Sequence, residues 1–244
     1  MDLKKARALV TGGSSGIGYA TAQLLRDRGA EVAICGRRAD ALEEAASELG
    51  ALAIVCDVSR EEEVVRMVDR VIAELGDYNV LINNAGWGTW APLVETTVAD
   101  FQRVWETNVL GAMLVARQSA KHFIKKNTGN IVNIASTSGQ RGGAGGTIYA
   151  STKFALTGMT ESWRAELRKN NIRVMQVNPS EVQTNFFVAS GRGARPDNPS
   201  KLRGEDIAHT IASMLELDDR GMVVETTVWA TNPRDYNRNR PRAA

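Results

Sequence analysis

The chain has 244 residues, of which 43% are hydrophobic and 24% charged, and its formal net charge is +2. Such a chain can bury a sizeable core, and its near-neutral charge argues against bulk electrostatic binding to nucleic acid or a membrane surface. No apolar run is long enough to span a bilayer, and the first residues lack the apolar region of a signal peptide. We therefore expect a cytoplasmic protein.

Two cysteines occur, Cys35 and Cys56. Both fall in apolar strand-like segments, so we interpret them as small buried hydrophobic residues. They do not form a metal-binding cluster, and a disulfide is not expected in a chain without an export signal. The sequence predicts no metal site.

Short β-branched runs alternate with longer helical patterns along the chain. The first run predicts a strand at 7–11, and a helix then extends from about Gly16 to Arg28 and stops at Gly29. Further strands are predicted at 31–35, 53–56, 80–82, 131–134, 173–177 and 223–228. Further helices are predicted at 39–49, 61–75, 98–125, 149–169 and 205–217.

This alternation predicts an α/β fold with one doubly wound parallel sheet of the Rossmann type and helices on both faces. Ligands bind such a sheet beyond the carboxyl ends of its strands, where the strand order reverses. Without an internal repeat or a linker, residues 1–244 are interpreted as a single domain. The stretch from Asn185 to Gly204 is expected to be irregular, and its place after the sixth strand favours a substrate lid over a surface insert.

A glycine-rich turn follows the first predicted strand. Its glycines let the chain reverse tightly and let a pyrophosphate approach the backbone, and the next helix offers unpaired N–H groups and the positive end of its dipole. The alternative is an ordinary strand-to-helix turn, since the spacing differs from the common Gly-x-Gly-x-x-Gly fingerprint. The residues of this candidate cofactor turn are Gly12, Ser14, Ser15, Gly16, Ile17 and Gly18.

The end of the second predicted strand lacks the acidic residue that accepts the ribose hydroxyls of NAD in folds of this type. Gly36 stands there instead, and Arg37 and Arg38 follow. A guanidinium pairs well with a phosphate, so we interpret this segment as a 2′-phosphate pocket and predict NADP(H) as the cofactor. The alternative is that both arginines merely open a helix in solvent.

Small and polar residues also end the next two strands. Asp57 and Val58 follow the third strand, where the carboxylate can accept a hydrogen bond from an adenine or cap the following turn. Asn84, Ala85 and Gly86 follow the fourth strand, and their small size lets a flat ring and its ribose pass close to the backbone.

Tyr149 and Lys153 lie one helical turn apart, downstream of Ser136. A carbonyl that accepts a hydride also needs a proton, and the Lys153 cation is expected to lower the pKa of Tyr149 from its usual value of about 10. Ser136 is expected to donate to the substrate oxygen, with Ser138 as its competitor. Taken singly, each residue also has a structural interpretation, as a turn hydroxyl or a helix-packing side chain.

Together these residues resemble the short-chain dehydrogenase/reductase family over about 6–228, and in particular its bacterial carbonyl-reductase and 3-oxoacyl-carrier-protein-reductase branch. The sequence departs from the family at Ser180, where glycine is usual, and after 228, where a glycine-rich ending is common in the acyl-carrier enzymes. The motifs that carry the resemblance are the glycine turn, Asp57, Asn83 to Gly86, Asn108, Ser136, Tyr149 with Lys153, and Asn178-Pro179.

The resemblance implies roles for further residues. The catalytic set is Asn108, Ser136, Tyr149 and Lys153, with Asn108 holding a water behind Lys153; a residue that satisfies a helix kink is the alternative for Asn108. The cofactor set gains Tyr149, Lys153, Pro179, Val182 and Thr184. A homodimer or homotetramer is implied, built through the helices at 98–125 and 149–169.

The predicted function is hydride transfer between NADP(H) and a small carbonyl or alcohol substrate, as an NADPH-dependent ketone or 3-oxoacyl reductase. The alternatives are an NAD(P)-dependent alcohol or sugar-alcohol dehydrogenase and a non-catalytic NADP-binding sensor. The arginine-rich tail at 233–244 is interpreted as a solvated end rather than a nucleic-acid-binding segment.

The substrate is not fixed by these motifs. Trp87, Trp90, Phe186 and Phe187 are candidates for an apolar substrate pocket, and equally for core or interface positions. Arg192 and Arg195 are candidates to meet an anionic substrate.

Overall fold

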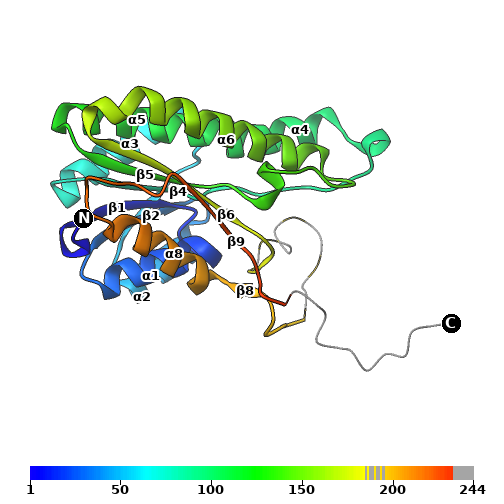
Figure 1. The fold of residues 1–244 in the computed structure, drawn as a ribbon, viewed down its shortest axis with the longest axis horizontal. Helices are drawn as coiled ribbons and strands as arrows, with labels where there is room; N and C mark the ends of the chain where they lie inside the picture. The colour runs from blue at the N-terminus through cyan, green and yellow to red at the C-terminus, as the bar shows by residue number, and fades with distance from the viewer. Residues whose placement is uncertain (185, 187–189, 191–192, 194–195, 233–244) are drawn as a thin grey trace.

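A computed structural model describes residues 1–184, 186, 190, 193 and 196–232. In this part of the chain seven strands form one parallel sheet in the order β3-β2-β1-β4-β5-β6-β9, so that the strand order reverses between β1 and β4 (Figure 1). The predicted doubly wound parallel sheet is thereby confirmed. The strands are β1 (Arg7–Thr11), β2 (Glu31–Gly36), β3 (Leu52–Val55), β4 (Val80–Asn83), β5 (Gly129–Ile134), β6 (Ile172–Pro179) and β9 (Glu225–Val228).

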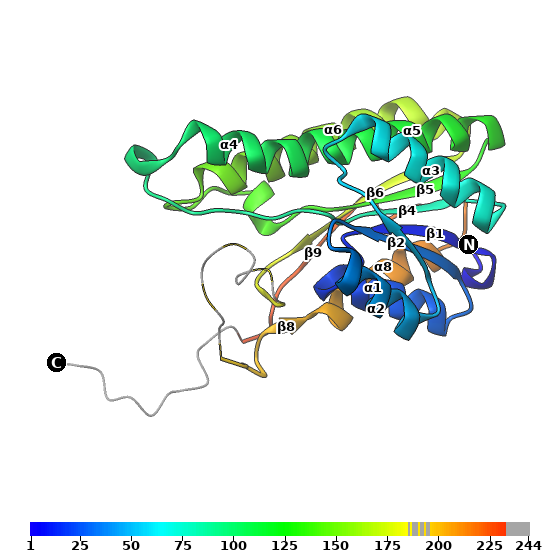
Figure 2. The ribbon, with the colours of Figure 1, turned by 180° about the vertical axis from the view of Figure 1, so that it is seen from behind.

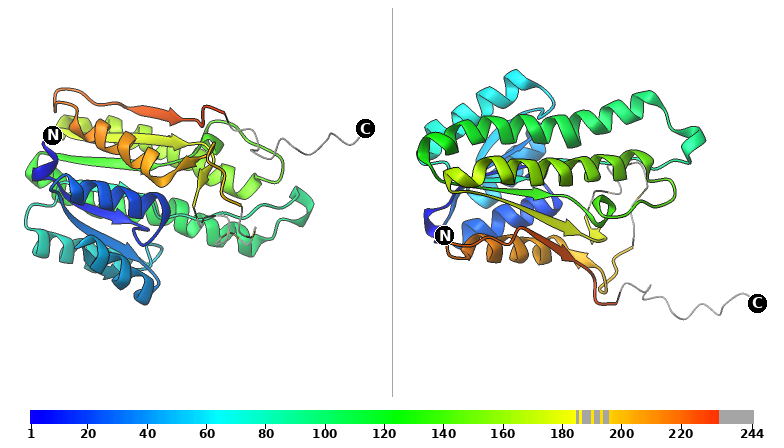
Figure 3. Two further views of the ribbon diagram at one scale, coloured as in Figure 1. Left: turned by 90° about the horizontal axis from the view of Figure 1, so that it is seen from below. Right: turned by 45° about the horizontal axis from the view of Figure 1, so that its top comes forward.

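Helices cover both faces of this sheet. Helices α1, α2 and α8 lie on one face, and α3, α4, α5 and α6 lie on the other (Figures 1 and 2). The view from below shows the first group, in blue and orange, packed against the strands (Figure 3). The helices are α1 (Gly16–Asp27), α2 (Ala39–Leu49), α3 (Glu61–Leu75), α4 (Val98–Trp105), α5 (Ala112–Lys126), α6 (Thr147–Leu167) and α8 (Gly204–Glu216).

The sheet separates two hydrophobic cores. Successive side chains of a strand point to opposite faces, so Val80 and Ile82 of β4 belong to the core under α1, α2 and α8, whereas Leu81 belongs to the core under α3 and α5. Strand β1 divides in the same way, with Val10 in the first core and Leu9 in the second. Burial on both faces explains why these strands are uniformly apolar in the sequence.

Local sequence sets the helix ends. Helix α2 stops at Gly50, which adopts a left-handed conformation with φ 60°, and α5 stops at Asn127 with φ 52°. Helix α3 opens with three glutamates, whose charge complements the positive end of the helix dipole. The predicted bounds of α2 and α3 are confirmed.

Two predictions about the chain path need correction. The helix expected at 98–125 contains a π-helical segment, Glu106–Gly111, between α4 and α5. The stretch from Asn185 to Gly204 is not irregular to its end, since Leu202–Arg203 forms a short strand, β8, that pairs in parallel with β7 (Val182–Gln183). The pairing joins Val182 to Leu202 and Gln183 to Arg203, and Asn198 N donates to Gln183 Oε1 at 2.6 Å; a window of two residues cannot reveal such contacts from sequence.

Both cysteines are free and buried, which confirms their interpretation as core residues. Burial raises the pKa of the Cys56 thiol to about 12. No helix in the described ranges is long and apolar enough to cross a membrane.

Candidate active site

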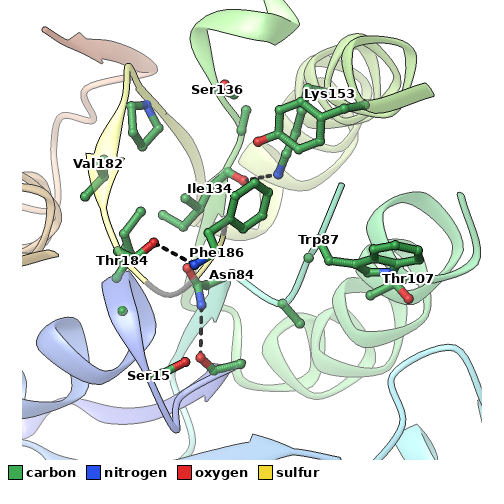
Figure 4. A pocket seen from close by; sticks show the side chains of 18 of the residues that line it. Ser15, Asn84, Trp87, Thr107, Ile134, Ser136, Lys153, Val182, Thr184 and Phe186 are labelled. Atoms are coloured by element: carbon green, nitrogen blue, oxygen red, sulfur yellow. Dashed lines mark hydrogen bonds between the residues drawn. The ribbon is translucent and has the colours of Figure 1, made fainter. Parts of the chain in front are cut away.

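A cavity of about 900 Å³ opens at the carboxyl ends of the strands, where the strand order reverses (Figure 4). Nearly all of the predicted site residues line it, although they come from segments far apart in the sequence; the exceptions are Gly18 and Asn108. The predicted residues in its wall are Gly12, Ser14, Ser15, Gly16, Ile17, Arg37, Arg38, Asp57, Val58, Asn84, Ala85, Gly86, Ser136, Tyr149, Lys153, Pro179, Val182 and Thr184.

The glycine turn after β1 is wedged between two other segments of the wall. Gly12 and Gly16 have φ values of 65° and 58°, which side chains rarely tolerate. A Cβ atom added at Gly12 would lie 3.1 Å from the Cα of Ala85, and one added at Gly16 would lie 3.1 Å from Cγ2 of Thr184. At Gly18 an added Cβ would collide with the Gly12 carbonyl, so Gly18 permits packing inside the turn rather than forming the cavity wall.

Helix α1 presents its amino end to the cavity. Ser15 occupies the N-cap position, but its side chain makes no capping hydrogen bond within the described part of the chain. Ser15, Gly16 and Ile17 all line the cavity, so the first-turn N–H groups and the positive dipole end are offered to a ligand. This uncapped cradle fits the pyrophosphate of a dinucleotide.

The segments after β2 and β3 bring three charged residues to the same cavity. Arg37 and Arg38 are exposed at its rim. Asp57 caps the following turn, because its Oδ1 accepts hydrogen bonds from Ser59 N at 3.0 Å and from Ser59 Oγ at 2.8 Å. The carboxylate thus fills the turn-capping role considered in the sequence, while it also lines the cavity.

The point where the strand order reverses is held together by side chain to backbone hydrogen bonds. Thr11, the last residue of β1, accepts hydrogen bonds at its Oγ1 from the backbone N–H groups of Asn84 and Ala85, each at 2.9 Å. Asn84 in turn donates its Nδ2 to the Thr11 carbonyl at 2.9 Å. These bonds fix the residues after β4 beside the glycine turn.

Three of the four predicted catalytic side chains, Ser136, Tyr149 and Lys153, meet at the opposite end of the cavity. Ser136 follows β5, and its Oγ accepts from Ser138 N at 3.1 Å and forms a hydrogen bond with Tyr149. Lys153 is 6% exposed, and its Nζ donates to the Ile134 carbonyl at 2.8 Å (Figure 4). The same Nζ lies 5.7 Å from the Tyr149 ring centroid. Ser138 lines the cavity too, but its backbone orients the Ser136 hydroxyl.

The expected lowering of the Tyr149 pKa is not what the structure gives. Burial raises the pKa of Tyr149 to about 12, and the hydrogen bond with Ser136 only partly offsets this rise. Burial also lowers the pKa of Lys153 to about 8. Desolvation therefore sets the direction of both shifts, and the Lys153 ammonium is bound to a backbone carbonyl. Tyr149 is protonated at neutral pH and is ready to donate a proton.

Asn108 lies in the π-helical segment and is 2% exposed. Its Nδ2 donates to the Trp87 carbonyl at 2.8 Å and to Thr152 Oγ1 at 3.1 Å, and its Oδ1 accepts from Trp87 N at 3.0 Å. Asn108 therefore ties the chain after β4 to helix α6. Its side-chain amide is engaged at both ends in this bridge.

Aromatic residues close the catalytic end. Trp87, Trp90 and Phe186 line the cavity, as the pocket interpretation requires. The Trp90 ring centroid lies 5.0 Å from that of Tyr149. The other candidates for the pocket and the lid, Phe187, Arg192 and Arg195, lie outside the described residues.

Two residues at the site, Gly88 and Thr107, are not predicted from the sequence. Thr107 lines the cavity and directly precedes Asn108, a position that the motif alone does not mark. Gly88 lies against the catalytic ring, because an added Cβ would be 2.7 Å from Tyr149 Cδ2 and 2.9 Å from Trp90 Cη2. A second glycine so soon after Gly86 was the available signal for such a close approach.

Gly88→Ala is expected to lower kcat by about 100-fold, because the new methyl group displaces the Tyr149 ring from its position beside Ser136. Steady-state kinetics and a thermal unfolding curve measure the effect on rate and stability. Gly158→Ala is the matched control, since a Cβ at this helical glycine meets no atom within 4 Å. Equal activity of the two variants would contradict the contact.

Comparison with known proteins agrees with this geometry. The short chain dehydrogenase family matches residues 6–194. The chain is 33% identical over 243 residues to the NADP-dependent 3-hydroxy acid dehydrogenase of Schizosaccharomyces pombe, with 94% of each chain covered. It is 38% identical over 179 residues to the 3-oxoacyl-[acyl-carrier-protein] reductase of Bos taurus, covering 72% of this chain and 76% of that protein. It spans about half (54%) of the uncharacterized oxidoreductase YxnA of Bacillus subtilis at 35% identity.

A solved structure shows the same fold. The alcohol dehydrogenase of the archaeon Thermococcus sibiricus, complexed with 5-hydroxy-NADP, matches with a TM-score of 0.85 and 28% identity, over 93% of this chain and 97% of that one. The fold, the cavity and these relatives define an oxidoreductase that uses a nicotinamide dinucleotide. The chain belongs to the short-chain dehydrogenase/reductase family and acts on CH–OH or C=O groups with NAD(P) as cofactor.

Proposed function

We propose that this protein is an NADPH-dependent ketone reductase. The observation that carries the proposal is the buried hydroxyl of Tyr149, which bonds to Ser136 and whose raised pKa keeps it protonated. A protonated hydroxyl at this position can give the substrate oxygen the proton that reduction requires, and the reverse reaction would return that proton to the same hydroxyl oxygen.

NADPH held by these residues would supply a hydride to the carbonyl carbon, so that a ketone, NADPH and a proton would give a secondary alcohol and NADP⁺. The Ser136 hydroxyl donates a hydrogen bond to the carbonyl oxygen as negative charge develops there. The Tyr149 hydroxyl then transfers its proton to that oxygen. The Lys153 ammonium is close enough to stabilise the phenolate that this transfer leaves behind.

The cofactor residues in this proposal are those that line the cavity. The uncapped end of α1 would hold the pyrophosphate, and the rim arginines Arg37 and Arg38 would hold the 2′-phosphate. Pro179, Val182 and Thr184 also line the cavity, and Thr184 lies beside Gly16 of the glycine turn. We also propose that 1–244 is one cofactor-binding domain, which the shared sheet supports, and that it resides in the cytoplasm, which its two free thiols support.

A 3-oxoacyl thioester remains a candidate substrate, since the similar bovine protein is a 3-oxoacyl-[acyl-carrier-protein] reductase. Oxidation of an alcohol or a sugar alcohol and cofactor sensing without catalysis are the alternatives. NADPH consumption, followed by absorbance with panels of ketones, acyl thioesters and sugars, decides among them. A binding protein without turnover of any carbonyl compound or alcohol would refute the reductase proposal.

Arg37→Ala is expected to raise the KM for NADPH by about 10- to 100-fold and to leave the KM for NADH almost unchanged, because only NADPH carries the additional phosphate. The two cofactors are compared in the same steady-state assay. Arg220→Ala serves as the control, since its exposed side chain lies outside the cavity and pairs with Asp218. An equal increase in KM for NADPH and NADH would contradict a 2′-phosphate pocket at Arg37.

We further propose a homodimer or homotetramer built through α4 and α6. Phe101, Leu110 and Phe154 support it, because they are 37%, 40% and 47% exposed on these elements and the π-helical segment. Val104 and Leu114, which fall in the helix predicted at 98–125, are buried in the core and do not belong to this patch. A symmetric, self-complementary patch is the commonest route to such assemblies.

Light scattering at micromolar concentration is expected to give a mass of at least two chains, and Phe154→Glu is expected to reduce it. Val55→Glu is the control, since Val55 is 53% exposed on β3, away from α4 and α6. A single-chain mass for the unmodified protein would contradict the assembly.

A further inference from the structure

Three aromatic rings lie together at the catalytic end of the cavity. Trp90 comes from the segment after β4, Tyr149 from α6, and Phe186 from the segment after β7. The ring centroids lie 5.0 Å apart for Trp90 and Tyr149, 5.7 Å for Tyr149 and Phe186, and 6.0 Å for Trp90 and Phe186. The interplanar angles of 41°, 60° and 80° are tilted and edge-on geometries, which aromatic pairs favour.

The backbone on both sides of Trp90 fixes this aromatic wall. Gly88 approaches both the Trp90 and the Tyr149 rings closely. Ala91 N donates to the Gly145 carbonyl at 3.1 Å, which joins the segment to the loop before α6. Phe186 N donates to Thr184 Oγ1 at 3.2 Å. A wall held in this way is formed before the substrate arrives, and it favours a rigid ligand that loses little freedom on binding.

The charges around the wall do not favour an anionic substrate. Of the described cavity-lining residues, the cations are Arg37 and Arg38, which follow the distant strand β2, and Lys153, which donates to the Ile134 carbonyl. Glu181, the acidic residue in the wall after β6, forms an ion pair with Lys201. Among the described residues of this part of the cavity, a carboxylate on the substrate would therefore be desolvated without a dedicated partner.

We propose that the substrate is an uncharged ketone whose carbonyl is part of, or directly attached to, a ring, and that Trp90 and Phe186 determine this specificity. The proposal rests on the reductase function above and names its substrate class. A flat ring packs on the faces and edges of Trp90 and Phe186 while its carbonyl oxygen meets Ser136 and Tyr149. An open-chain ketone gains fewer of these contacts and loses more conformational freedom on binding.

Equilibrium binding tests the ring preference separately from turnover. The protein is saturated with NADP⁺, which cannot reduce a ketone, and is titrated in a calorimeter with 2-tetralone and with 2-decanone, a bicyclic and an open-chain ketone of equal carbon number. We expect 2-tetralone to bind at least about tenfold more tightly. The anionic ketone levulinate is expected to bind more weakly than either, and equal or tighter binding of 2-decanone or levulinate would overturn the proposal.

Trp90→Leu keeps an apolar side chain but removes the ring, and it is expected to lose the about tenfold preference for 2-tetralone. Trp229→Leu is the matched control, because Trp229 is 52% exposed and lies outside the cavity; this variant is expected to keep the preference. Phe186→Leu removes the second ring of the aromatic wall and is likewise expected to lose the preference for 2-tetralone. A preference that survives in both cavity variants would overturn the assignment of these residues.

Turnover with NADPH separates this inference from the function on which it rests. Reduction of 2-decanone or levulinate in preference to 2-tetralone would refute the ring specificity and leave the reductase function intact. Tight binding of 2-tetralone without turnover of any ketone would refute the reductase function and leave the aromatic site intact.

Discussion

Tyr149→Phe is expected to lower kcat for ketone reduction by about 1,000-fold while NADPH still binds. The substitution removes only the hydroxyl that donates the proton. The ring and its contacts with Gly88, Trp90 and Phe186 are retained, so the cavity keeps its shape. Turnover is measured by NADPH absorbance, and NADPH affinity by fluorescence titration.

Tyr19→Phe is the matched control, because it removes an exposed hydroxyl that bonds to Glu48 and lies outside the cavity. Its kcat is expected to equal that of the unmodified protein. Should the Tyr149 variant retain a tenth or so of the original rate, proton transfer by this hydroxyl would have to be abandoned.

Lys153→Met is expected to abolish most activity and to make the folded protein more stable at pH 7. Lys153 is buried, and burial lowers its pKa from 10.5 to about 8, so holding its charge in the folded state costs on the order of 3 kcal/mol. Methionine removes this cost. It also leaves the Ile134 carbonyl without its donor, which destabilises the folded state by about 1–2 kcal/mol. A net gain of about 1 kcal/mol or more is therefore expected.

The pH dependence makes this second expectation specific. Between pH 8 and 10.5 the unfolded lysine binds more protons than the folded one, so the unmodified protein gains stability from this group as the pH rises through that window. The methionine variant lacks this gain. Urea unfolding at a series of pH values compares the two proteins, with the exposed Lys121→Met as control. If the free energy of unfolding depended on pH in the same way in both proteins, burial of Lys153 would not destabilise the folded state.

Much of this architecture follows from local sequence. The helices at 39–49 and 61–75 are predicted to the residue, because Gly50 and the three glutamates after Arg60 mark their ends chemically. The cofactor turn and the Tyr149/Lys153 pair are also found in the wall of one cavity, as the position after each strand predicts.

What could not be predicted depends on contacts between distant segments. The pairing of β7 with β8 joins residues that are about 20 positions apart. The bridge from Asn108 to Trp87 and Thr152 spans three elements, so no motif reveals it. The pKa of Tyr149 depends on how completely the surrounding residues exclude water. The one-turn spacing between Tyr149 and Lys153 carries no information about this burial.

Because the sheet divides the interior into two cores, the residues on its two faces can evolve independently. Leu9 and Val10 are sequence neighbours, yet they face different cores, so a change of volume at one is absorbed by a different set of side chains from a change at the other. Substitutions without shared partners have nearly additive effects on stability. Substitutions can therefore accumulate in the core under α1, α2 and α8 while the layer that carries Tyr149 and Lys153 remains unchanged. The opposite case is equally possible, because neither core requires compensating substitutions on the other side of the sheet.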